Sequence, residues 1–453
     1  MLVETKNLHL PHIEEEILDS GYEGAKAAIQ HLEGVTGMLA GNSESGTLIT
    51  TKWDGSPAIV AGTNPENGKF FVGTKSVFNK TVPKICYTPG DINEMYSGEL
   101  AEKLRACLKH LPKLNIKGIL QGDLMFTEGD VKERKIDGKN HLTFMPNTIL
   151  YAIPTDSKLG KKIAKAKLGI IFHTGYDGPS IKDLSATHRI SVKDLTSTPD
   201  VWFDDATYLD ASGAVTLTAQ ETAEAIRHIE AARRALARIT KEEFNKITSD
   251  KKYVQFLKQY QNQLIRGGEL IGDISQWITS LPEFIATKIG KEKVKPETQK
   301  KKIEKLHAHA REAEGALRKI LEFQKHIIEA KHILIRKLET AKRIGTFRVS
   351  DKGLIVAPQE GFVCVDKLGR AVKLVDRLEF SRANFLRREE DGEEGEITAV
   401  IGTPSLLSQT SLMSQASYMG GETGLAGKDP VQTPYLGTPT GQFSDSTGTL
   451  GSA

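Results

Sequence analysis

Residues 47–73, TLITTKWDGSPAIVAGTNPENGKFFVG, carry the clearest strand signal in the chain. The run TLITTKW is rich in β-branched residues, SPAIVAG is a second apolar run, and TNPENGK has the Asn, Pro and Gly of a turn before FFVG. Short apolar runs bounded by turn residues predict strands, and the central turn predicts a hairpin. We therefore expect this stretch to form antiparallel sheet.

Further strands and long helices are predicted on either side of this stretch. Apolar residues at helical spacing mark residues 12–40 and 219–345, and from Ile303 a spacing of three to four predicts one long helix in a coiled-coil-like seam. Short apolar runs bounded by Gly, Pro or charge predict buried strands. These runs are residues 118–126, 148–153, 168–173, 354–357, 361–366 and 371–376.

Together these patterns predict an α+β fold of antiparallel sheets and helices. We place one domain in two pieces, residues 1–205 and 346–388, interrupted by a long helical insertion over residues 206–345. Residues 389–453 are first acidic and then rich in Gly, Ser and Thr, which predicts a disordered, flexible tail.

Charge is distributed unevenly behind a net value of +3. Residues 221–340 hold 25 Lys and Arg against 17 Asp and Glu, whereas residues 390–453 hold one basic residue against eight acidic ones. The basic helices favour nucleic-acid phosphates as a partner, with a solvated helical face as the alternative. The acidic tail is typical of a linker, or else of a docking segment for a protein partner. The basic contact face would include Lys291, Lys293, Lys295 and residues 300–302.

Composition excludes several classes of protein. The 453 residues contain three cysteines, too few for a disulfide scaffold, and no C-x-x-C metal pair. The sequence has no run of about 18 apolar residues, which a membrane span would need, and its first residues do not resemble a secretory signal. We therefore expect a cytoplasmic protein without a membrane partner. Signature motifs of P-loop ATPases, zinc proteases and serine hydrolases are absent from the sequence.

An ordered series of polar residues accompanies the predicted strands. Lys52-Trp53-Asp54-Gly55 follows the first strand and resembles the K-x-D-G motif I of the covalent nucleotidyltransferase superfamily, which includes ATP-dependent RNA and DNA ligases and mRNA capping enzymes. In the order of that family's later motifs come Lys75, Asp123 in QGDL, Glu360 in EGFV, and Lys373. Stretches such as LQGDLMFT and GIIFHTGYDG are similar to an uncharacterised ligase-like family of large tailed phages.

The resemblance implies a ligase-type nucleotidyltransferase (adenylation) domain that uses ATP with Mg²⁺ or Mn²⁺. In such a domain Lys52 would be the nucleophile, on a turn shaped by Asp54, and Lys373 would be a catalytic cation that also contacts the nucleotide. Other residues would bind the nucleotide or its metal. These are Lys75 near the phosphates, Asp123 and Glu360 as nucleotide contacts and metal ligands, and Tyr151 or Phe172 stacked on adenine.

The resulting hypothesis is an ATP-dependent polynucleotide ligase that forms lysyl-AMP at Lys52 and joins a 5′-phosphate to a 3′-hydroxyl in RNA or DNA. A non-catalytic phage binding or assembly protein that keeps this fold is the first alternative. It is favoured by departures from the family pattern at Ser56-Pro57, Asp123 and Val375. A guanylyltransferase that uses GTP is the second, although the acidic tail cannot supply the OB-fold that usually follows in capping enzymes.

Overall fold

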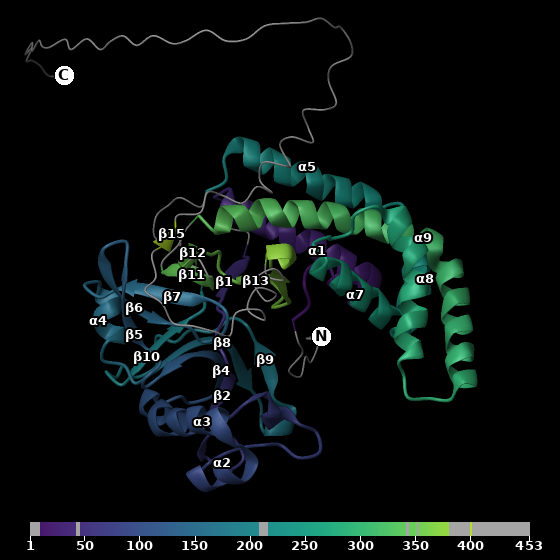
Figure 1. Ribbon diagram of the computed structural model, residues 1–453. Coiled ribbons are helices and arrows are strands. Elements are labelled where there is room, and N and C mark those ends of the chain that lie inside the picture. Colours follow the sequence, from purple (N-terminus) through teal and green to yellow (C-terminus); the bar gives the residue numbers. More distant parts are fainter. Residues whose placement is uncertain are drawn as a thin grey trace, which may run out of the picture. The chain divides into compact units, whose positions relative to one another are not determined.

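Three sheets and a group of long helices make up the described part of the protein (Figure 1). The computed structural model describes residues 10–41, 46–207, 216–340, 344–350, 353–379 and 399–400, all within one compact unit, Met1–Ile401. The expected mixed α+β content is confirmed. Most of the expected flexible tail, residues 389–453, lies outside the described residues. Within it, Ala399 and Val400 form a short strand that pairs with Leu354 and Ile355, so these two residues are not flexible tail as expected.

The central sheet holds the predicted hairpin. Asn64 caps the turn between β2 and β3, because its backbone N–H donates to Lys69 O at 3.0 Å and its side chain accepts from Glu66 N at 2.9 Å. The sheet is antiparallel except for the parallel pair β8–β10, and β9 pairs with β8. In order its strands are β10 (Val201–Asp205), β8 (Leu168–Asp177), β4 (Ile119–Thr127), β2 (Ala58–Thr63) and β3 (Phe70–Gly73), with β9 (Ser185–Thr187) at the side.

A second sheet joins the two ends of the described chain. It has three antiparallel strands in the order β1 (Leu48–Lys52), β13 (Gly361–Val365) and β14 (Ala371–Leu374). The run TLITTKW therefore forms strand as expected, but it is not part of the hairpin sheet that follows it. Residues 53–57 carry the chain from this second sheet into the central one.

The third sheet packs against the central sheet. One apolar core contains Met125, Phe126 and Trp202 from the central sheet together with Phe144 and Tyr151 from the third. On the opposite face of the central sheet lie α2 (Pro89–Met95) and α3 (Gly98–His110). The third sheet runs in the order β15 (Ala399–Val400), β12 (Gly353–Val356), β11 (Gly345–Ser350), β7 (Leu150–Pro154), β6 (Lys139–Phe144) and β5 (Lys132–Ile136), and α4 (Lys158–Ile163) contacts β6 and β7.

The helices form where their sequence patterns predict them. Capping boxes begin α5 at Thr218 and α6 at Thr240, and the long helix expected from Ile303 begins earlier, with Pro296 in its first turn. No helix in the described ranges is both long and apolar enough to cross a bilayer. The helices of this group are α1 (Glu16–Leu39), α5 (Ala219–Leu236), α6 (Lys241–Thr248), α7 (Lys251–Arg266), α8 (Ile274–Gly290) and α9 (Pro296–Leu338).

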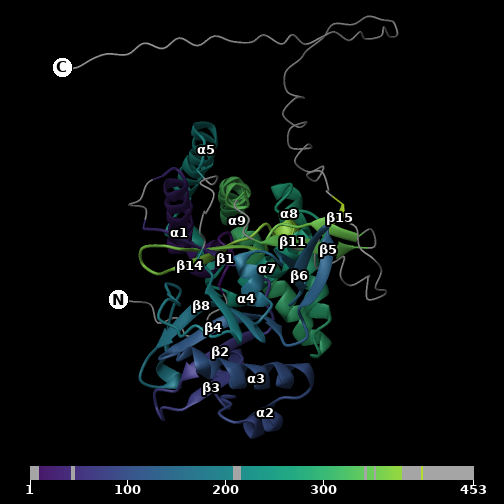
Figure 2. The same ribbon diagram turned by 90° about the vertical axis from the view of Figure 1, so that its left-hand side faces the viewer.

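These helices share one core with the three-stranded sheet. Phe362 and Cys364 of β13 and Leu374 of β14 belong to the same buried cluster as apolar residues of α1 and α9. Figure 2 shows α1, α5 and α9 on one side of this sheet and the central sheet on the other. The predicted helical insertion therefore shares its hydrophobic core with β14, the strand that carries Lys373.

Candidate functional site

Lys52 and Glu360 meet because of strand register. Lys52 ends β1 and pairs with Gly361, the first residue of β13, so that Glu360 lies directly beside it. The Nζ of Lys52 contacts Oε1 of Glu360 in an ion pair whose carboxylate side chain is only 9% exposed. Two residues that stand near opposite ends of the described sequence therefore form one chemical unit.

Burial makes this carboxylate unusually basic. Desolvation raises the pKa of Glu360 to about 7, against the opposing effect of Lys52, and the negative charges of Asp54 and Asp123 add to the rise. A carboxylate with this pKa can accept a proton and release it near neutral pH. Glu360 is thus suited to proton exchange with the ammonium group that it contacts.

Lys373 is the second amine of the site. It lies on β14 opposite Val363 of β13. Burial lowers the pKa of Lys373 to about 8, and the neighbouring charge of Lys52 acts in the same direction while Glu360 opposes it. Lys373 is thus a cation at neutral pH but close to its titration point, within the field of both members of the ion pair.

The central sheet contributes Asp123 to the same region. Asp123 lies on β4 between Ala58 of β2 and Ile171 of β8, and its Oδ1 is 3.6 Å from Nε2 of His173. Both side chains are partly exposed, at 21% and 27%. His173 was missed by the sequence analysis. Alternation along β8 separates Phe172 from His173, but only the pairing with β4 shows which of them shares a face with Asp123.

Asp54 anchors the turn rather than facing a ligand. Its buried carboxylate accepts hydrogen bonds from Asn147 Nδ2 at 2.7 Å, from Thr148 N at 2.6 Å and Oγ1 at 2.5 Å, and from Ile149 N at 2.9 Å. These bonds tie the turn after β1 to the chain that enters β7. Shaping the Lys52 turn therefore stays the predicted role of Asp54, and a direct part in catalysis is not what these contacts indicate.

The two aromatic residues expected to stack on adenine are both packed inside the protein. The hydroxyl of Tyr151 accepts a hydrogen bond from Asp54 N at 2.8 Å, and its ring lies between those of Trp53 and Phe144, with centroids 5.3 and 5.5 Å away. Phe172 is fully buried in the core between the central sheet and α3. Neither ring presents a face to a ligand, because strand alternation turns both toward apolar cores.

Lys75 lies at the edge of the site. It is exposed and begins the short 3-10 helix Lys75–Phe78 that follows β3. Its charge is the smallest of the contributions that lower the pKa of Lys373. Beside it, the hydroxyls of Ser76 and Tyr96 are 3.1 Å apart. Lys75 is thus near enough to act electrostatically on the site but is not in contact with the ion pair.

Carboxylates for a metal are few. Within the described ranges no group of three or more His, Cys, Asp or Glu side chains is arranged to hold a metal ion. Mg²⁺ commonly uses only one or two protein carboxylates and completes its shell with water and substrate phosphates. Glu360 and Asp123 fit such a limited role, in which a bound phosphate would supply further ligands.

The geometry defines an α+β protein whose charged site, two lysines and two carboxylates, lies where a three-stranded sheet meets the central sheet. Residues 7–389 match a family model described as a family of unknown function, DUF6267, and the chain belongs to this family. No curated protein and no solved structure matches the chain. Every candidate site residue lies inside the matched range.

Proposed function

We propose that the protein is an ATP-dependent, polynucleotide ligase-like nucleotidyltransferase with a ligase-type adenylation domain. Lys52 takes AMP from ATP, passes it to a 5′-phosphate of RNA or DNA, and a 3′-hydroxyl then displaces AMP to seal the strand. The contact between Lys52 and Glu360 carries this proposal. A lysine that is to act as a nucleophile must lose a proton, and Glu360 is the adjacent acceptor.

In the first step Lys52 is adenylylated, and the side chains of this site can supply the nucleophile, the proton acceptor and a stabilising cation. The neutral Nζ of Lys52 attacks the α-phosphorus of ATP, a P–N bond forms, and the bond from that phosphorus to the bridging oxygen breaks to release pyrophosphate. The proton leaves the Lys52 ammonium for the carboxylate of Glu360. Lys373 remains charged at neutral pH and stabilises the negative charge that develops on the α-phosphate.

Other side chains would bind the nucleotide and its metal. Asp123 is the candidate ligand of Mg²⁺ or Mn²⁺ in this first step, and the metal would neutralise the phosphates of ATP. Glu360 is a candidate ligand only while it is ionised, before it accepts the proton or after it has released it. Asp123 would also accept a hydrogen bond from a ribose hydroxyl, and it is partly exposed, as is His173 beside it. Lys75 is the candidate contact for the outer phosphates.

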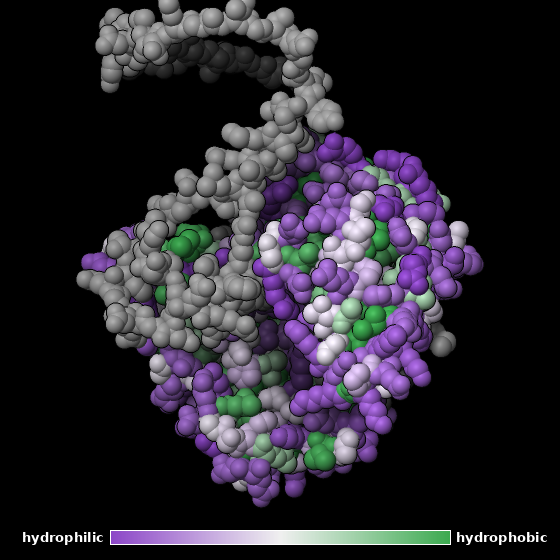
Figure 3. Space-filling view, turned by 45° about the vertical axis from the view of Figure 1, so that its right-hand side comes forward, coloured by the Kyte–Doolittle hydropathy of each residue, from purple (hydrophilic) through white to green (hydrophobic). Residues whose placement is uncertain are grey.

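Nucleic-acid ends are the proposed substrate, and the turn between α8 and α9 is a candidate contact surface. Residues 288–305 hold eight lysines and three acidic residues. The carboxylate of Glu292 forms ion pairs with Lys302 Nζ at 2.6 Å and with Lys252 Nζ at 3.4 Å. The helical group presents a mainly hydrophilic face (Figure 3). Exposed lysines attract phosphates without regard to base sequence. Besides Lys288, whose Nζ lies over the ring of Phe284, those without a carboxylate partner in the described chain are Lys291, Lys293, Lys295, Lys300 and Lys301.

Intact-mass measurement after incubation with ATP and Mg²⁺ tests the proposal. We expect the mass of one AMP to be added to the protein, and the adduct to be absent from Lys52→Ala. Lys69→Ala, which removes an exposed lysine before β3, is the matched control and should keep the adduct. A GMP adduct formed in preference to AMP would make the protein a guanylyltransferase. A folded wild-type protein that gains neither nucleotide would leave the non-catalytic binding or assembly protein.

A further inference from the structure

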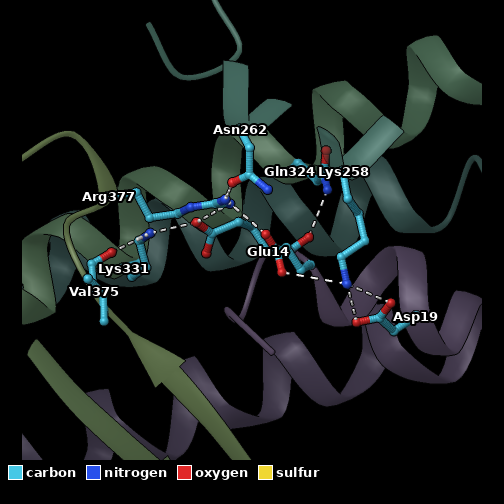
Figure 4. A network of polar contacts seen from close by, with 9 residues as sticks. Glu14, Asp19, Lys258, Asn262, Gln324, Lys331, Val375 and Arg377 are labelled. Atoms are coloured by element: carbon cyan, nitrogen blue, oxygen red, sulfur yellow. Dashed lines mark hydrogen bonds and ion pairs between the residues drawn. The ribbon is translucent and has the colours of Figure 1, made fainter. Parts of the chain in front are cut away.

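A buried group of charges connects the helices to the strand that carries Lys373. Glu14 and Lys331 are both fully buried, and Glu14 Oε1 is 3.0 Å from Lys331 Nζ. Arg377 adds a second cation, with Nη1 3.6 Å from the same Glu14 oxygen and Nη2 2.9 Å from Glu15 Oε1. Figure 4 shows Lys331 reaching from α9 between Glu14 and Val375, and Arg377 crossing toward Glu14 and Asn262.

Two sets of hydrogen bonds connect this group to β14, one at Lys373 itself and one at Val375, the residue after the strand. The backbone of Lys373 donates to Pro11 O at 2.9 Å and accepts from Ile13 N at 3.1 Å, in the segment that leads directly into Glu14. Two residues further on, the carbonyl of Val375 accepts a hydrogen bond from Lys331 Nζ at 3.0 Å. One set of bonds comes from the segment before Glu14 and the other from Lys331, and Glu14 and Lys331 form one ion pair. The position of Lys373 therefore depends on Lys331 of α9.

The ionic character of this group indicates a geometric role. Burial alone would raise the pKa of Glu14, but Lys331 and Arg377 outweigh it and lower that pKa to about 2, so the carboxylate is charged at neutral pH. Replacing a buried ion pair by well-packed apolar residues is often neutral or stabilising. A buried ion pair is therefore weak evidence for a contribution to stability. The charged groups of this core do supply directional bonds to Val375 and to the segment beside Lys373.

We propose that Glu14, Lys331 and Arg377 are positioning residues that hold Lys373 in the site, which makes α9 part of the catalytic apparatus. The proposal rests on the proposed function for its catalytic part. The structural part is independent, because β14 is an edge strand of its sheet and is held on its open side by Pro11 and Ile13. Without the Lys331 contact this edge would move, and Lys373 would lose its alignment with Lys52.

The reactivity of the Lys373 amine gives a test that needs no activity. Competitive acetylation of the full chain over a range of pH, read by peptide mass spectrometry, yields the pKa of this amine. The charged groups that act on it are Lys52 from β1, Glu360 before β13, Glu15 before α1 and Lys75 after β3. We expect a midpoint near 8 in the wild type. In Lys331→Met it should move toward the ordinary value of about 10.4, because a displaced amine gains water.

A matched control exists on the same helix. Lys319 also donates both to a carboxylate, Glu243 at 2.6 Å, and to a backbone carbonyl, Arg238 O at 3.1 Å, but it contacts no part of β14. Lys319→Met should leave the Lys373 midpoint unchanged, and Lys331→Arg should restore much of the wild-type value. If Lys331→Met does not fold, the double variant Glu14→Gln/Lys331→Met, which leaves neither charge, takes its place.

The rate of lysyl-AMP formation is the second readout. We expect it to fall roughly tenfold or more in Lys331→Met, since small misplacements of catalytic groups have effects of this size. An unchanged Lys373 midpoint in a folded variant, or an equal shift in Lys319→Met, would overturn the inference. A shifted midpoint in a protein whose wild type takes up no AMP would support the positional coupling and reject the proposed function.

Discussion

Gly55 and Asp123 approach each other so closely that a methyl group on Gly55 would lie 2.6 Å from the Cβ of Asp123. The glycine therefore lets the turn after Lys52 pack directly on β4, and it brings the lysine strand and the carboxylate strand together. Gly55→Ala should destabilise the protein by about 1–3 kcal/mol, as overpacking does, and should lower AMP uptake. Chemical denaturation and intact mass measure the two effects.

Gly118 provides the control for this substitution. A Cβ at Gly118 would meet its nearest neighbour, the backbone oxygen of Tyr176, at 3.9 Å, which is ordinary van der Waals distance. Gly118→Ala should therefore change stability by no more than about 0.5 kcal/mol. Equal effects of the two substitutions would show that the approach of Gly55 to Asp123 has no special importance.

The rate of lysyl-AMP formation should have a bell-shaped pH dependence. In the free protein Glu360, with a pKa of about 7, must be ionised to accept the proton, and Lys373, with a pKa of about 8, must be charged. The ratio kcat/KM should rise through the first value and fall above the second. Glu360→Gln should remove the acidic limb and lower the rate by about 10²- to 10⁴-fold. An acidic limb that survives in Glu360→Gln would exclude this carboxylate as the proton acceptor.

The contribution of Glu360 to stability should fall with pH over the range in which its contribution to the catalytic rate rises. Its pKa in the folded protein is raised from 4.5 to about 7, so between these values the folded state binds more protons than the unfolded chain. The contribution of this group to the free energy of unfolding therefore decreases as pH rises through that window. Glu360→Gln should flatten this decrease, by up to about 3 kcal/mol, in urea titrations at pH 4.5 and 8.

Substitutions of Asp54 and Asp123 should separate effects on stability from effects on AMP uptake. Asp54 is buried and accepts four hydrogen bonds, so Asp54→Ala leaves several buried donors without a partner. We expect a loss of at least about 3 kcal/mol in unfolding free energy. Asp123 is partly exposed, and Asp123→Ala should change stability by less than about 1 kcal/mol while AMP uptake is lost. Reversed effects would contradict these assignments.

A double-mutant cycle measures the buried pair of Glu14 and Lys331. Each single substitution, Glu14→Gln or Lys331→Met, leaves a buried charge without its partner and should destabilise by about 3–5 kcal/mol. The double variant should lose less than the sum of the two, with a coupling of about 1–3 kcal/mol. Thermal and urea unfolding provide the values. Strict additivity would mean that the two groups do not interact.

Nucleic-acid binding should depend on the turn between α8 and α9. Changing Lys291, Lys293, Lys295, Lys300 and Lys301 to Gln should weaken binding of a labelled nicked duplex in fluorescence anisotropy. The slope of log K against log salt should fall by about 0.9 for every phosphate that the variant no longer neutralises. The control changes five exposed lysines in and after α4, which alters net charge equally. They are Lys158, Lys161, Lys162, Lys165 and Lys167. Equal weakening by both sets would mean that binding depends on net charge alone.

The sequence by itself determined where many of the strands and the long helices form, and it indicated candidate site residues. Short apolar runs bounded by turn residues predicted the hairpin of β2 and β3 and the strands β13 and β14, and helical spacing predicted the long helix α9, because these patterns depend only on neighbouring residues. Lys52, Asp123, Glu360 and Lys373 were selected because their segments resemble, in the same order, the motifs of the nucleotidyltransferase superfamily.

Only the tertiary structure decided how these pieces combine. The pairing of Lys52 with Gly361, the burial of Tyr151 and Phe172, the place of His173 beside Asp123, and the Glu14–Lys331 pair all depend on contacts between distant segments. Strand alternation tells which residues share a face but not which face is covered, and helical spacing does not reveal that a lysine on α9 will be fully buried. Burial sets the pKa of a charged group, and burial is a property of the assembled fold.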